Sequence, residues 1–490
     1  MSTEPNFANR TIWTGDNLDI LRGLNSNCVD LIYLDPPFNS NRTYAAPVGS
    51  VAAGAAFKDT WTLSDLDVAW MGLIADEQPA VYRVIETAGL THGKGMQSYL
   101  CMMAVRLLEM KRVLKESGSI YLHCDSTASH YLKLLMDSIF DAANFRNEIA
   151  WKRTTGRSDG ERYGRVYDVL LYYAGQGATW NNVYVPHDPE YVRKFYRHED
   201  KRGLFSSSDL TAAETRTGES GEPWREAEPT ESGRHWAVPS VGSYADWIEA
   251  NILPGYKSIK GVHDRLEALD EAGMLHWPQK EGGLPRLKRY LASTPGQKCN
   301  NFISDILPVQ AQAKERIGYP TQKPLALLER ITTASSNPGD LILDPFCGCA
   351  TACVAAESLG RKWIGIDLSP KAVELVKLRL ADAMGGLFHD RLVTSRSDVP
   401  KRTDIDAPIH YRQNKHVLFG KQEGQCNGCK MEFPFKVLEV DHVLPRSRGG
   451  TDHMDNLQLL CSHCNRTKGD RTQEFLVNEL SKMKSVGKFV

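Results

Sequence analysis

Two short apolar runs, far apart in the chain, both end in Asp-Pro, and this repeated pattern constrains the fold most strongly. Residues 28–39 read CVDLIYLDPPFN, and residues 339–369 read GDLILDPFCGCATACVAAESLGRKWIGIDLS. The first is typical of a buried parallel strand ending in a loop, and the second of a strand, a turn, a helix and another strand. Helical stretches expected near 97–115 and 127–140 and the strand-like GSIYLHCD (118–125) complete the pattern. Together they predict an α/β fold with a doubly wound sheet.

Length and composition indicate a large globular protein. The chain has 490 residues, of which 41% are hydrophobic and 24% are charged, so we expect two or three domains. No apolar run approaches the roughly 20 residues of a membrane span, and MSTEPNFANR has no signal pattern. We therefore expect a cytoplasmic protein with no membrane partner. The formal net charge of -1 neither favours nor excludes a nucleic acid.

The later of the two runs has the features of a cofactor site. Residues 344–351 place small side chains where a strand meets a helix N-terminus, which lets a ligand approach backbone amides. Asp367 ends the next strand, where a carboxylate can accept both ribose hydroxyls of an adenosyl group. Taken alone, this pattern fits a nucleoside or dinucleotide site and a purely structural turn equally well.

The earlier run supplies groups that could activate an amine. Asp35, Pro36, Pro37 and Phe38 combine a carboxylate, a rigid pair that presents a carbonyl and an aromatic ring at a strand end. The amino group of a purine is a poor nucleophile because its lone pair is delocalised. The Asp35 side chain and the Pro36 carbonyl could accept its two protons and turn the lone pair toward a methyl donor. Phe38 could stack on a base that has left the duplex.

Three motifs and their order resemble a known family. DPPF at 35–38, PTQKP at 320–324 and DPFCG at 344–348 are similar to motifs of β-class DNA amino-methyltransferases, such as the modification subunits of type III restriction systems. In that family the catalytic motif precedes the cofactor motif, as it does here. The likeness covers nearly all of 10–385 and includes TGDN (14–17), GSIYLHCD (118–125), RNEIAWKR (146–153), KRYLASTPG (288–296) and ERIGYPTQKPLALLERI (315–331).

The resemblance implies methyl transfer from S-adenosylmethionine to the exocyclic amine of a base in double-stranded DNA. By this likeness the catalytic group is Asp35, Pro36 and Phe38, with Pro37 between them. The residues around the cofactor would be Asp344, Phe346, Gly348, Asp367, Gln322, Lys323 and Pro324. Aspartate rather than serine before Pro-Pro-Phe favours adenine N6 as the target, and cytosine N4 stays the alternative.

The chain departs from the family pattern after DPFCG. The family usually continues with Ser-Gly-Thr, whereas this chain has Cys349, Ala350 and Thr351. Alanine in place of glycine at a helix start is expected to be sterically mild, so we expect cofactor binding to survive. Cys349 and Cys353 are interpreted as small packing residues.

Four of the eleven cysteines form two CxxC pairs near the C-terminus. A cytosolic chain of this length is not expected to hold disulfides, so the cysteines are expected to be thiols or metal ligands. Two such pairs supply the four thiolates of a closed tetrahedral zinc site, which should fold its module rather than catalyse. The expected zinc ligands are Cys426, Cys429, Cys461 and Cys464.

The segment between and around these pairs resembles a second family. Residues 438–470, LEVDHVLPRSRGGTDHMDNLQLLCSHCNRTKGD, are similar to HNH, or ββα-metal, nucleases, and the likeness extends over 420–471. Phosphodiester hydrolysis requires a divalent ion to neutralise phosphate charge and a base to deprotonate water. By this likeness Asp441 and the amide oxygen of Asn465 would hold Mg²⁺ or Mn²⁺, and His442 would be the base.

Further HNH residues have supporting roles by the same likeness. Asn456 would fix the loop that carries His442, and Arg446 or Lys468 would contact phosphate. Because four cysteines fill the zinc shell, His453 and His463 are interpreted as solvent-facing.

These patterns predict three parts of the chain. A Rossmann-like methyltransferase domain covers 10–385 and contains a loop-rich target-recognition insert at about 176–318, followed by a linker at 386–415 and a small zinc-bound ββα HNH domain at 416–490. The leading hypothesis is a bacterial or phage-encoded protein of the restriction-modification type, which methylates DNA and cleaves or nicks it. Its rivals are a methyltransferase whose HNH module only binds DNA, and a DNA-binding regulator that has lost methyl transfer. A homodimer stays open.

Overall fold

The structure is a computed structural model in which two compact units are distinguished. Residues 182–299 form one unit, and the described residues on either side of them form the other. Each unit has its own hydrophobic core. The described residues are 4–38, 42–45, 50–52, 56–59, 70–71, 74–154, 156, 161, 163–280, 282–384, 393–404 and 411–485.

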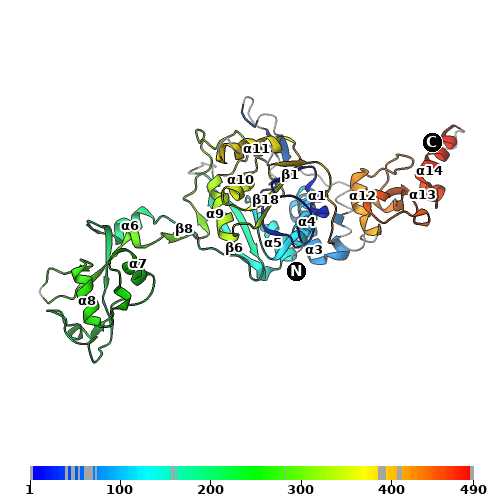
Figure 1. Ribbon diagram of the computed structural model, residues 1–490. Helices are drawn as coiled ribbons and strands as arrows, with labels where there is room; N and C mark the ends of the chain where they lie inside the picture. Colours follow the sequence, from blue (N-terminus) through cyan, green and yellow to red (C-terminus); the bar gives the residue numbers. More distant parts are fainter. Residues whose placement is uncertain are drawn as a thin grey trace. The chain divides into compact units, whose positions relative to one another are not determined.

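A nine-stranded sheet is the centre of the first unit (Figure 1). In sheet order its strands are β16 (Phe302–Ile303), β6 (Phe145–Lys152), β7 (Tyr167–Ala174), β5 (Leu114–Cys124), β2 (Val29–Leu34), β17 (Leu341–Asp344), β18 (Lys362–Asp367), β1 (Thr11–Thr14) and β19 (Thr394–Arg396). The strands from β5 to β19 run parallel, whereas β7 is antiparallel to β5 and β6. The predicted α/β sheet is confirmed, and it brings β2 beside β17 although these strands are distant in sequence.

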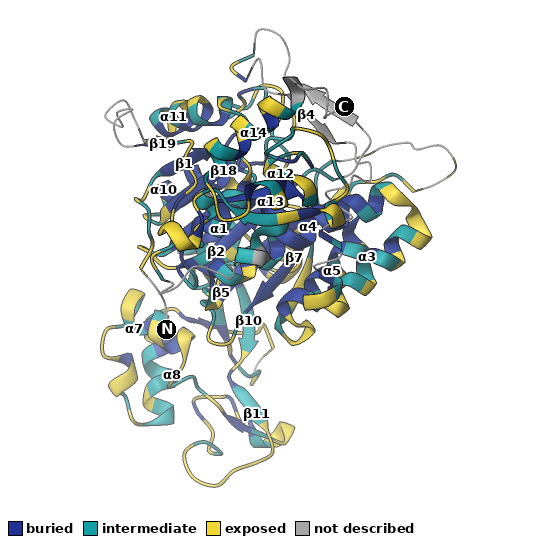
Figure 2. Cartoon of the chain, turned by 90° about the vertical axis from the view of Figure 1, so that its right-hand side faces the viewer, coloured by how far each residue is buried: buried dark blue, intermediate teal, exposed yellow. Residues whose placement is uncertain are grey.

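Helices cover both faces of this sheet. One face carries α1 (Asn17–Gly23), α3 (Pro79–His92), α4 (Lys94–Val113) and α5 (Ser129–Phe140), and the other carries α9 (Leu325–Ser335), α10 (Thr351–Ser358) and α11 (Lys371–Met384). Side chains of a strand alternate between faces, so Ile32 and Leu34 join the first core and Leu31 and Tyr33 the second. The central strands β2, β17 and β18 are consequently buried, and Figure 2 shows a largely buried sheet. A separate hairpin joins β3 (Arg42–Ala45) to β4 (Ala56–Asp59).

The sheet extends into the region expected to be a linker. Strand β19 pairs in parallel with β1, and the segment after it is held by residues near the N-terminus. The Asn25 side chain accepts a hydrogen bond from the backbone of Thr403 at 2.8 Å, and the Asp404 carboxylate accepts one from the backbone of Ser26 at 2.8 Å. Residues 394–404, within the range expected to be a linker, therefore contact the sheet and the segment after α1. Residues 386–392 and 405–410 lie outside the described residues.

The second unit has a sheet and a core of its own, whereas the sequence suggested loops. Its elements are α6 (Pro189–Phe195), the four-stranded sheet of β13 (Leu275–His276), β14 (Arg286–Tyr290), β10 (Gly203–Asp209) and β9 (His198–Asp200), the hairpin of β11 (Thr211–Ala213) and β12 (Arg234–Trp236), and the helices α7 (Ser243–Asn251) and α8 (Val262–Glu271). The core is rich in aromatic side chains, including Trp224, Trp236 and Tyr256. The sequence did not indicate this core, because its apolar residues are widely spaced among polar ones.

The C-terminal module is a hairpin covered by short helices. Its elements are α12 (Lys415–Lys421), β20 (Leu438–His442), β21 (Leu457–Cys461), α13 (Ser462–Lys468) and α14 (Gln473–Ser485). The two strands are antiparallel, with His442 opposite Leu457, and their apolar side chains pack with the cysteines. Among the described residues of the whole chain, no helix is both long and apolar enough to span a membrane.

Candidate active sites in the sheet and the C-terminal module

Three carboxylates lie at the carboxyl ends of adjacent parallel strands. Asp35 directly follows β2, Asp344 ends β17, and Asp367 ends β18. In α/β sheets this edge is where ligands bind. The sheet order therefore gathers the predicted catalytic carboxylate and both predicted cofactor carboxylates at one edge, although their motifs are far apart in sequence.

Asp35 is paired with a lysine that the sequence assigned to the cofactor. The Lys323 Nζ atom donates a hydrogen bond to Asp35 Oδ2, and both side chains are largely buried. The other carboxylate oxygen, Oδ1, is buried and has no hydrogen-bond partner among the described residues. Burying such an acceptor without a partner costs about 1–3 kcal/mol. Oδ1 of Asp35 is therefore the candidate acceptor for a hydrogen-bond donor of a bound ligand.

Phe38 lies beside this pair. Lys323 Nζ is 5.5 Å from the centre of the Phe38 ring. Pro36, between Asp35 and Phe38 in the chain, is buried. Pro37 is half-buried, as is Phe38. The carboxylate, the cation and the ring thus form one compact group at the end of β2.

Asp367 fixes the turn after β17. Its carboxylate accepts backbone hydrogen bonds from Gly348 at 2.8 Å and from Ser369 at 2.8 Å. Burial raises the pKa of Asp367, and it raises the pKa of Asp344 well above its usual range. Asp344 accepts a hydrogen bond from the backbone of Phe346 at 3.2 Å. Both carboxylates thus accept hydrogen bonds from the backbone around the turn after β17. The turn therefore has a fixed shape before any ligand binds.

Gly348 is required by its surroundings. Its φ is +48°, and a Cβ atom there would lie 2.9 Å from the hydroxyl of Tyr319, a residue of the loop that contains PTQKP. In the same loop the Gln322 side chain accepts from the backbone of Ile317 at 3.1 Å and donates to the carbonyl of Glu315. Gln322 therefore braces its own loop, while Pro324 caps the start of α9.

The expectation that Ala350 is sterically mild is wrong. Ala350 adopts the left-handed conformation, with φ +53° and ψ +41°, at the position where the resembling family has glycine. An L-residue with a Cβ atom pays roughly 1–2 kcal/mol in this region. The buried Arg379 compensates, because its Nη1 donates to the Cys349 carbonyl at 2.9 Å and to Thr351 Oγ1 at 2.6 Å. In this chain the hydrogen bonds of Arg379, from α11, hold the turn in the conformation that a glycine would adopt without strain.

We expect Ala350→Gly to stabilise the protein. Relief of the left-handed strain outweighs the added freedom of glycine in the unfolded chain, so the free energy of unfolding should rise by about 1 kcal/mol. Chemical denaturation of the methyltransferase part measures the change. Ala352→Gly, inside α10, is the matched control and should destabilise by about 1 kcal/mol. A loss of stability in both variants would show that Ala350 is not strained.

A buried polar chain beneath Phe38 was not predicted. His123, at the end of β5, contacts the Tyr33 hydroxyl through Nδ1 at 3.0 Å and Asp168 through Nε2 at 3.3 Å. Arg153 donates to Asp168 at 3.1 Å. The only sequence signal was the position of His123 next to a predicted strand end.

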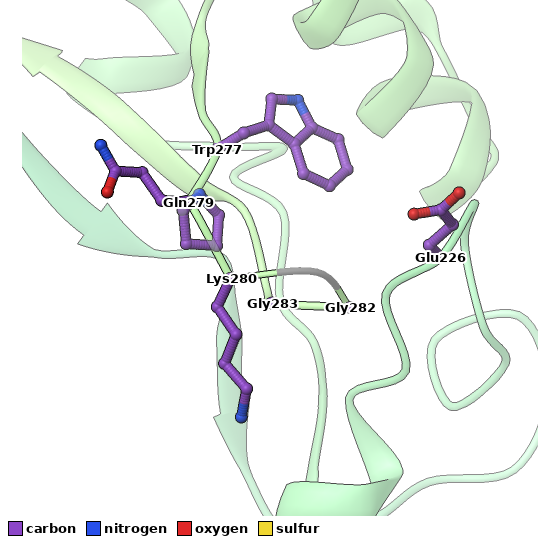
Figure 3. Close-up of a pocket in the computed structure, with 7 residues that line it drawn as sticks. Glu226, Trp277, Gln279, Lys280, Gly282 and Gly283 are labelled. Carbon is purple, nitrogen blue, oxygen red and sulfur yellow. The ribbon is translucent and has the colours of Figure 1, made fainter.

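The second unit contains a cavity of about 190 Å³ (Figure 3). Its lining includes Trp277, which stacks on Trp224 with ring centres 5.7 Å apart, and Glu226. None of the predicted site residues lines it. It belongs to the unit that the sequence assigned to target recognition.

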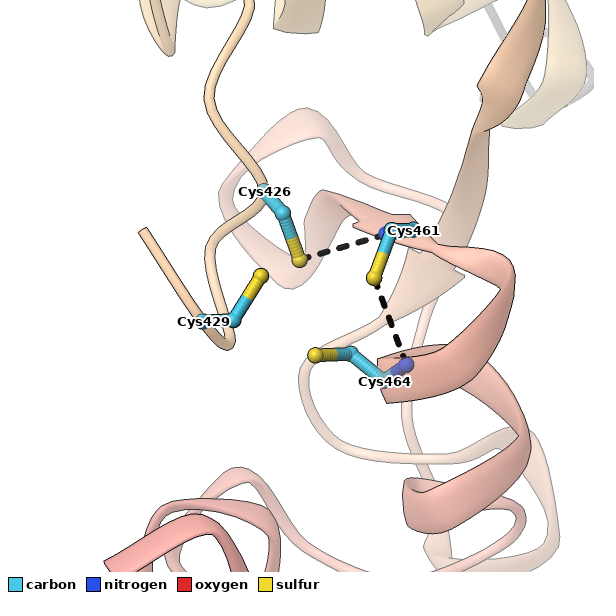
Figure 4. Close-up of side chains that lie close together, drawn as sticks. All are labelled: Cys426, Cys429, Cys461 and Cys464. Atoms are coloured by element: carbon cyan, nitrogen blue, oxygen red, sulfur yellow. Dashed lines mark hydrogen bonds between the residues drawn. The ribbon is translucent and has the colours of Figure 1, made fainter. Parts of the chain in front are cut away.

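The predicted zinc ligands come together in the C-terminal module. The sulfur atoms of Cys426, Cys429, Cys461 and Cys464 all lie within 4.8 Å of one another (Figure 4). The backbone of Cys461 donates to the Cys426 sulfur at 3.2 Å, and that of Cys464 to the Cys461 sulfur at 3.5 Å. A hydrogen bond from Cys464 lowers the pKa of Cys426 to about 4. Four converging sulfurs with amide donors fit a tetrahedral zinc ion.

Removing one of these ligands should unfold the module. We expect Cys426→Ser, or zinc chelation, to make residues beyond about 415 sensitive to protease, because zinc binding supplies folding free energy. Methyl transfer should persist. Cys299→Ser, at a half-buried cysteine outside the cluster, makes the same chemical change and should leave the digestion pattern unaltered. Limited proteolysis with mass spectrometry of the fragments distinguishes the two. An intact module in the Cys426 variant would contradict a structural zinc.

His442 and Asp441 stand at the end of β20. His442 Nε2 contacts Asp452 at 2.7 Å, and Arg446 also pairs with Asp452. Burial, together with the charge of Arg446, lowers the pKa of His442. The buried Lys468 donates to the His442 carbonyl at 2.7 Å and lies 3.0 Å from Asp441 Oδ2. The sequence left Arg446 and Lys468 as the two candidates for a phosphate contact, and in the structure the Lys468 ammonium faces Asp441.

Asn456 and Asn465 each make hydrogen bonds within the module. Asn456 accepts from the backbone of Leu444 at 2.8 Å and donates to the carbonyls of Leu444 and Thr451, so it ties down the loop after His442. The Asn465 amide nitrogen donates to Glu439 at 2.5 Å, which leaves its oxygen as the ligating end. An amide oxygen and the Asp441 carboxylate are donors suited to a hard divalent ion. Glu439 was missed because nothing in its local sequence marks it.

The sheet and its edge define a class of α/β protein with a nucleotide-type ligand site at the strand ends. The chain belongs to the DNA methylase family, whose model matches residues 29–378. It also contains an HNH endonuclease domain, matched at residues 426–481. Both resemblances predicted from sequence are thereby confirmed.

Individual relatives are bacterial modification enzymes. The Type II methyltransferase M.EcaI of Enterobacter cloacae is 32% identical over 326 residues, which are 66% of this chain and 66% of that protein. The Mod subunit of the Type III restriction-modification enzyme StyLTI of Salmonella typhimurium is 27% identical over 71% of this chain and 50% of its own length. The chain thus spans less than two thirds of each. The crystal structure of the M1.HpyAVI–SAM complex aligns with 76% of this chain and 98% of its own, at 14% identity and a TM-score of 0.33.

Proposed function

We propose that this protein transfers a methyl group from S-adenosylmethionine to N6 of adenine in double-stranded DNA. The observation that carries the proposal is the buried Oδ1 of Asp35, which has no partner in the part of the chain that the structure describes. Lys323 occupies the other carboxylate oxygen, so Oδ1 is the acceptor left for the N–H of a target amine. The Pro36 carbonyl would take the second N–H, which directs the nitrogen lone pair toward the methyl donor.

The chain supplies orientation and electrostatics, since the sulfonium methyl group is already activated. S-adenosylmethionine would lie over the turn that contains Gly348, with its ribose hydroxyls on Asp367 and its adenosyl group near Phe346. Lys323 donates a hydrogen bond to Oδ2 of Asp35, which orients that carboxylate. Phe38 would stack on the base after it leaves the duplex. Family membership supports the cofactor, because members transfer methyl groups to amines.

The choice of adenine over cytosine rests on Asp35 as the first residue of the motif. Purified protein, tritiated S-adenosylmethionine and unmethylated plasmid DNA test it directly. Chromatography of the digested nucleosides should place the label in N6-methyladenine. Label in N4-methylcytosine would replace this proposal with the cytosine alternative.

We further propose that the HNH domain hydrolyses DNA with Mg²⁺ or Mn²⁺ on Asp441 and Asn465 and with His442 as base. The ion would supply the charge that stabilises the phosphate. A module that only grips DNA is the second candidate, and it is favoured by the Lys468 ammonium 3.0 Å from Asp441, where it competes with a metal ion. A nicking assay on supercoiled plasmid with added Mg²⁺ separates the two candidates.

A further inference from the structure

His123 holds a position from which it can control Phe38. Its ring lies nearly parallel to the Phe38 ring, with centres 6.0 Å apart and an interplanar angle of 19°. Trp151 contacts the imidazole edge-on at 5.7 Å. The His123 side chain is fully buried, so it cannot itself reach solvent or DNA. An effect of His123 on the reaction must therefore pass through neighbouring side chains, of which Phe38 is the one in the catalytic motif.

Two hydrogen bonds fix the plane of the imidazole. The buried Tyr33 hydroxyl donates to Nδ1, and Nε2 contacts the Asp168 carboxylate. Burial alone would raise the pKa of Asp168, but the hydrogen bond from His123 and the positive charge of Arg153 outweigh it and lower that pKa. Asp168 is therefore a carboxylate acceptor. An imidazole protonated on Nε2 satisfies both partners at once, and rotation of the ring would break both bonds.

The chain of contacts joins three strands at the site edge. Tyr33 belongs to β2 and Asp168 to β7, while His123 lies between them on β5. The Tyr33 hydroxyl keeps its proton, because burial and then the charge of Asp35 raise its pKa well above its usual range. The same strand that carries Tyr33 leads directly into the loop of Asp35 and Phe38. The imidazole is thus anchored to the rigid sheet, and Phe38 on the adjoining loop rests against it.

We propose that Tyr33, His123 and Asp168 are positioning residues that hold the Phe38 ring in the plane required to stack on the flipped target base. This inference rests on the proposed methyl transfer to adenine. A base stacked on a fixed ring has its amine aligned with Asp35, whereas a ring that tilts moves the amine away from the methyl group. A displacement of about 1 Å can cost roughly 100-fold in rate.

The test compares two buried tyrosines of the sheet. Tyr33→Phe removes the hydroxyl that pairs with His123, and Tyr121→Phe removes a hydroxyl that pairs with Ser335 at 2.7 Å. Both tyrosines are buried and each variant loses one hydrogen bond, so their stabilities should fall similarly. His123→Leu is the direct variant, but it leaves Tyr33 and Asp168 without partners and could misfold, so Tyr33→Phe decides.

We expect Tyr33→Phe to lower kcat about 10- to 100-fold with unchanged S-adenosylmethionine affinity, and Tyr121→Phe to stay close to wild type. Binding to a duplex with 2-aminopurine at the target adenine should give weaker fluorescence enhancement with Tyr33→Phe, since the flipped base is less well held. Equal kcat values for the two variants would overturn the inference. If the wild-type protein still methylates adenine in that case, the proposed function stands. Absence of adenine methylation by the wild-type protein would instead overturn the proposed function.

Discussion

Asp35→Ala is expected to lower methyl transfer by at least about 100- to 1,000-fold, because it removes the acceptor that orients the target amine. S-adenosylmethionine binding should be nearly unchanged, since Asp35 lies at the end of β2 and the proposed cofactor turn follows β17. Single-turnover transfer of labelled methyl and calorimetric titration of the cofactor measure the two quantities separately. Asp35→Asn keeps the size of the side chain and should show a comparable loss.

The control for this prediction lies on the same strand. Asp30, near the start of β2, is likewise a carboxylate paired with a lysine, since Lys115 Nζ donates to it at 2.7 Å. Asp30→Ala removes this ion pair, together with a hydrogen bond from the Leu341 backbone at 2.9 Å, at the opposite end of β2 and should leave the rate within a few-fold of wild type. Equal losses of transfer and cofactor binding in the Asp35 variants would show that Asp35 is not an acceptor for the target amine.

His442→Ala is expected to abolish DNA cleavage to within detection, a loss of about 100- to 10,000-fold for a missing general base. Cleavage by the wild-type protein should need added Mg²⁺ or Mn²⁺, because a zinc ion with four thiolates has no vacant position. The proposed ion ligands are left intact by the substitution, so DNA binding should persist in a fluorescence anisotropy titration. His453→Ala, at an exposed histidine of the same module, is the matched control.

Substitutions at Asn465 refine the same prediction. Asn465→Asp keeps an oxygen ligand and should retain part of the activity, whereas Asn465→Ala should lose most of it. Plasmid nicking followed over time, with a preparation shown free of other nucleases, gives the rates. Undiminished nicking by the His442→Ala protein would contradict the assignment of the base.

The strand ends of the main site could be predicted from sequence because their signals are local. An apolar run that stops at Asp-Pro marks a buried strand and its loop within a few residues, as at Asp35 and Asp344. The two CxxC pairs are equally local, and their fixed spacing in each pair predicted the sulfur cluster. The sheet then brought these segments together as the α/β pattern requires.

Contacts between distant segments could not be read in this way. Lys323 and Asp35 are 288 residues apart, and their pairing depends on the loop before α9 reaching the end of β2. The Tyr33, His123 and Asp168 chain depends on which strands are neighbours, and Asp168 enters through an antiparallel strand that interrupts the parallel order. The left-handed conformation of Ala350 could not be predicted, because alanine favours other conformations. The hydrogen bonds that stabilise this turn come from Arg379, which lies on α11.

The most direct test of the account is the sequencing of DNA from cells that express the protein, with reads that distinguish modified bases. The account predicts N6-methyladenine at one recurring sequence in cells with the wild-type chain, and unmodified adenine at that sequence in cells with Asp35→Ala. N4-methylcytosine in its place, or unmodified DNA in the presence of folded wild-type protein that binds S-adenosylmethionine, would contradict it.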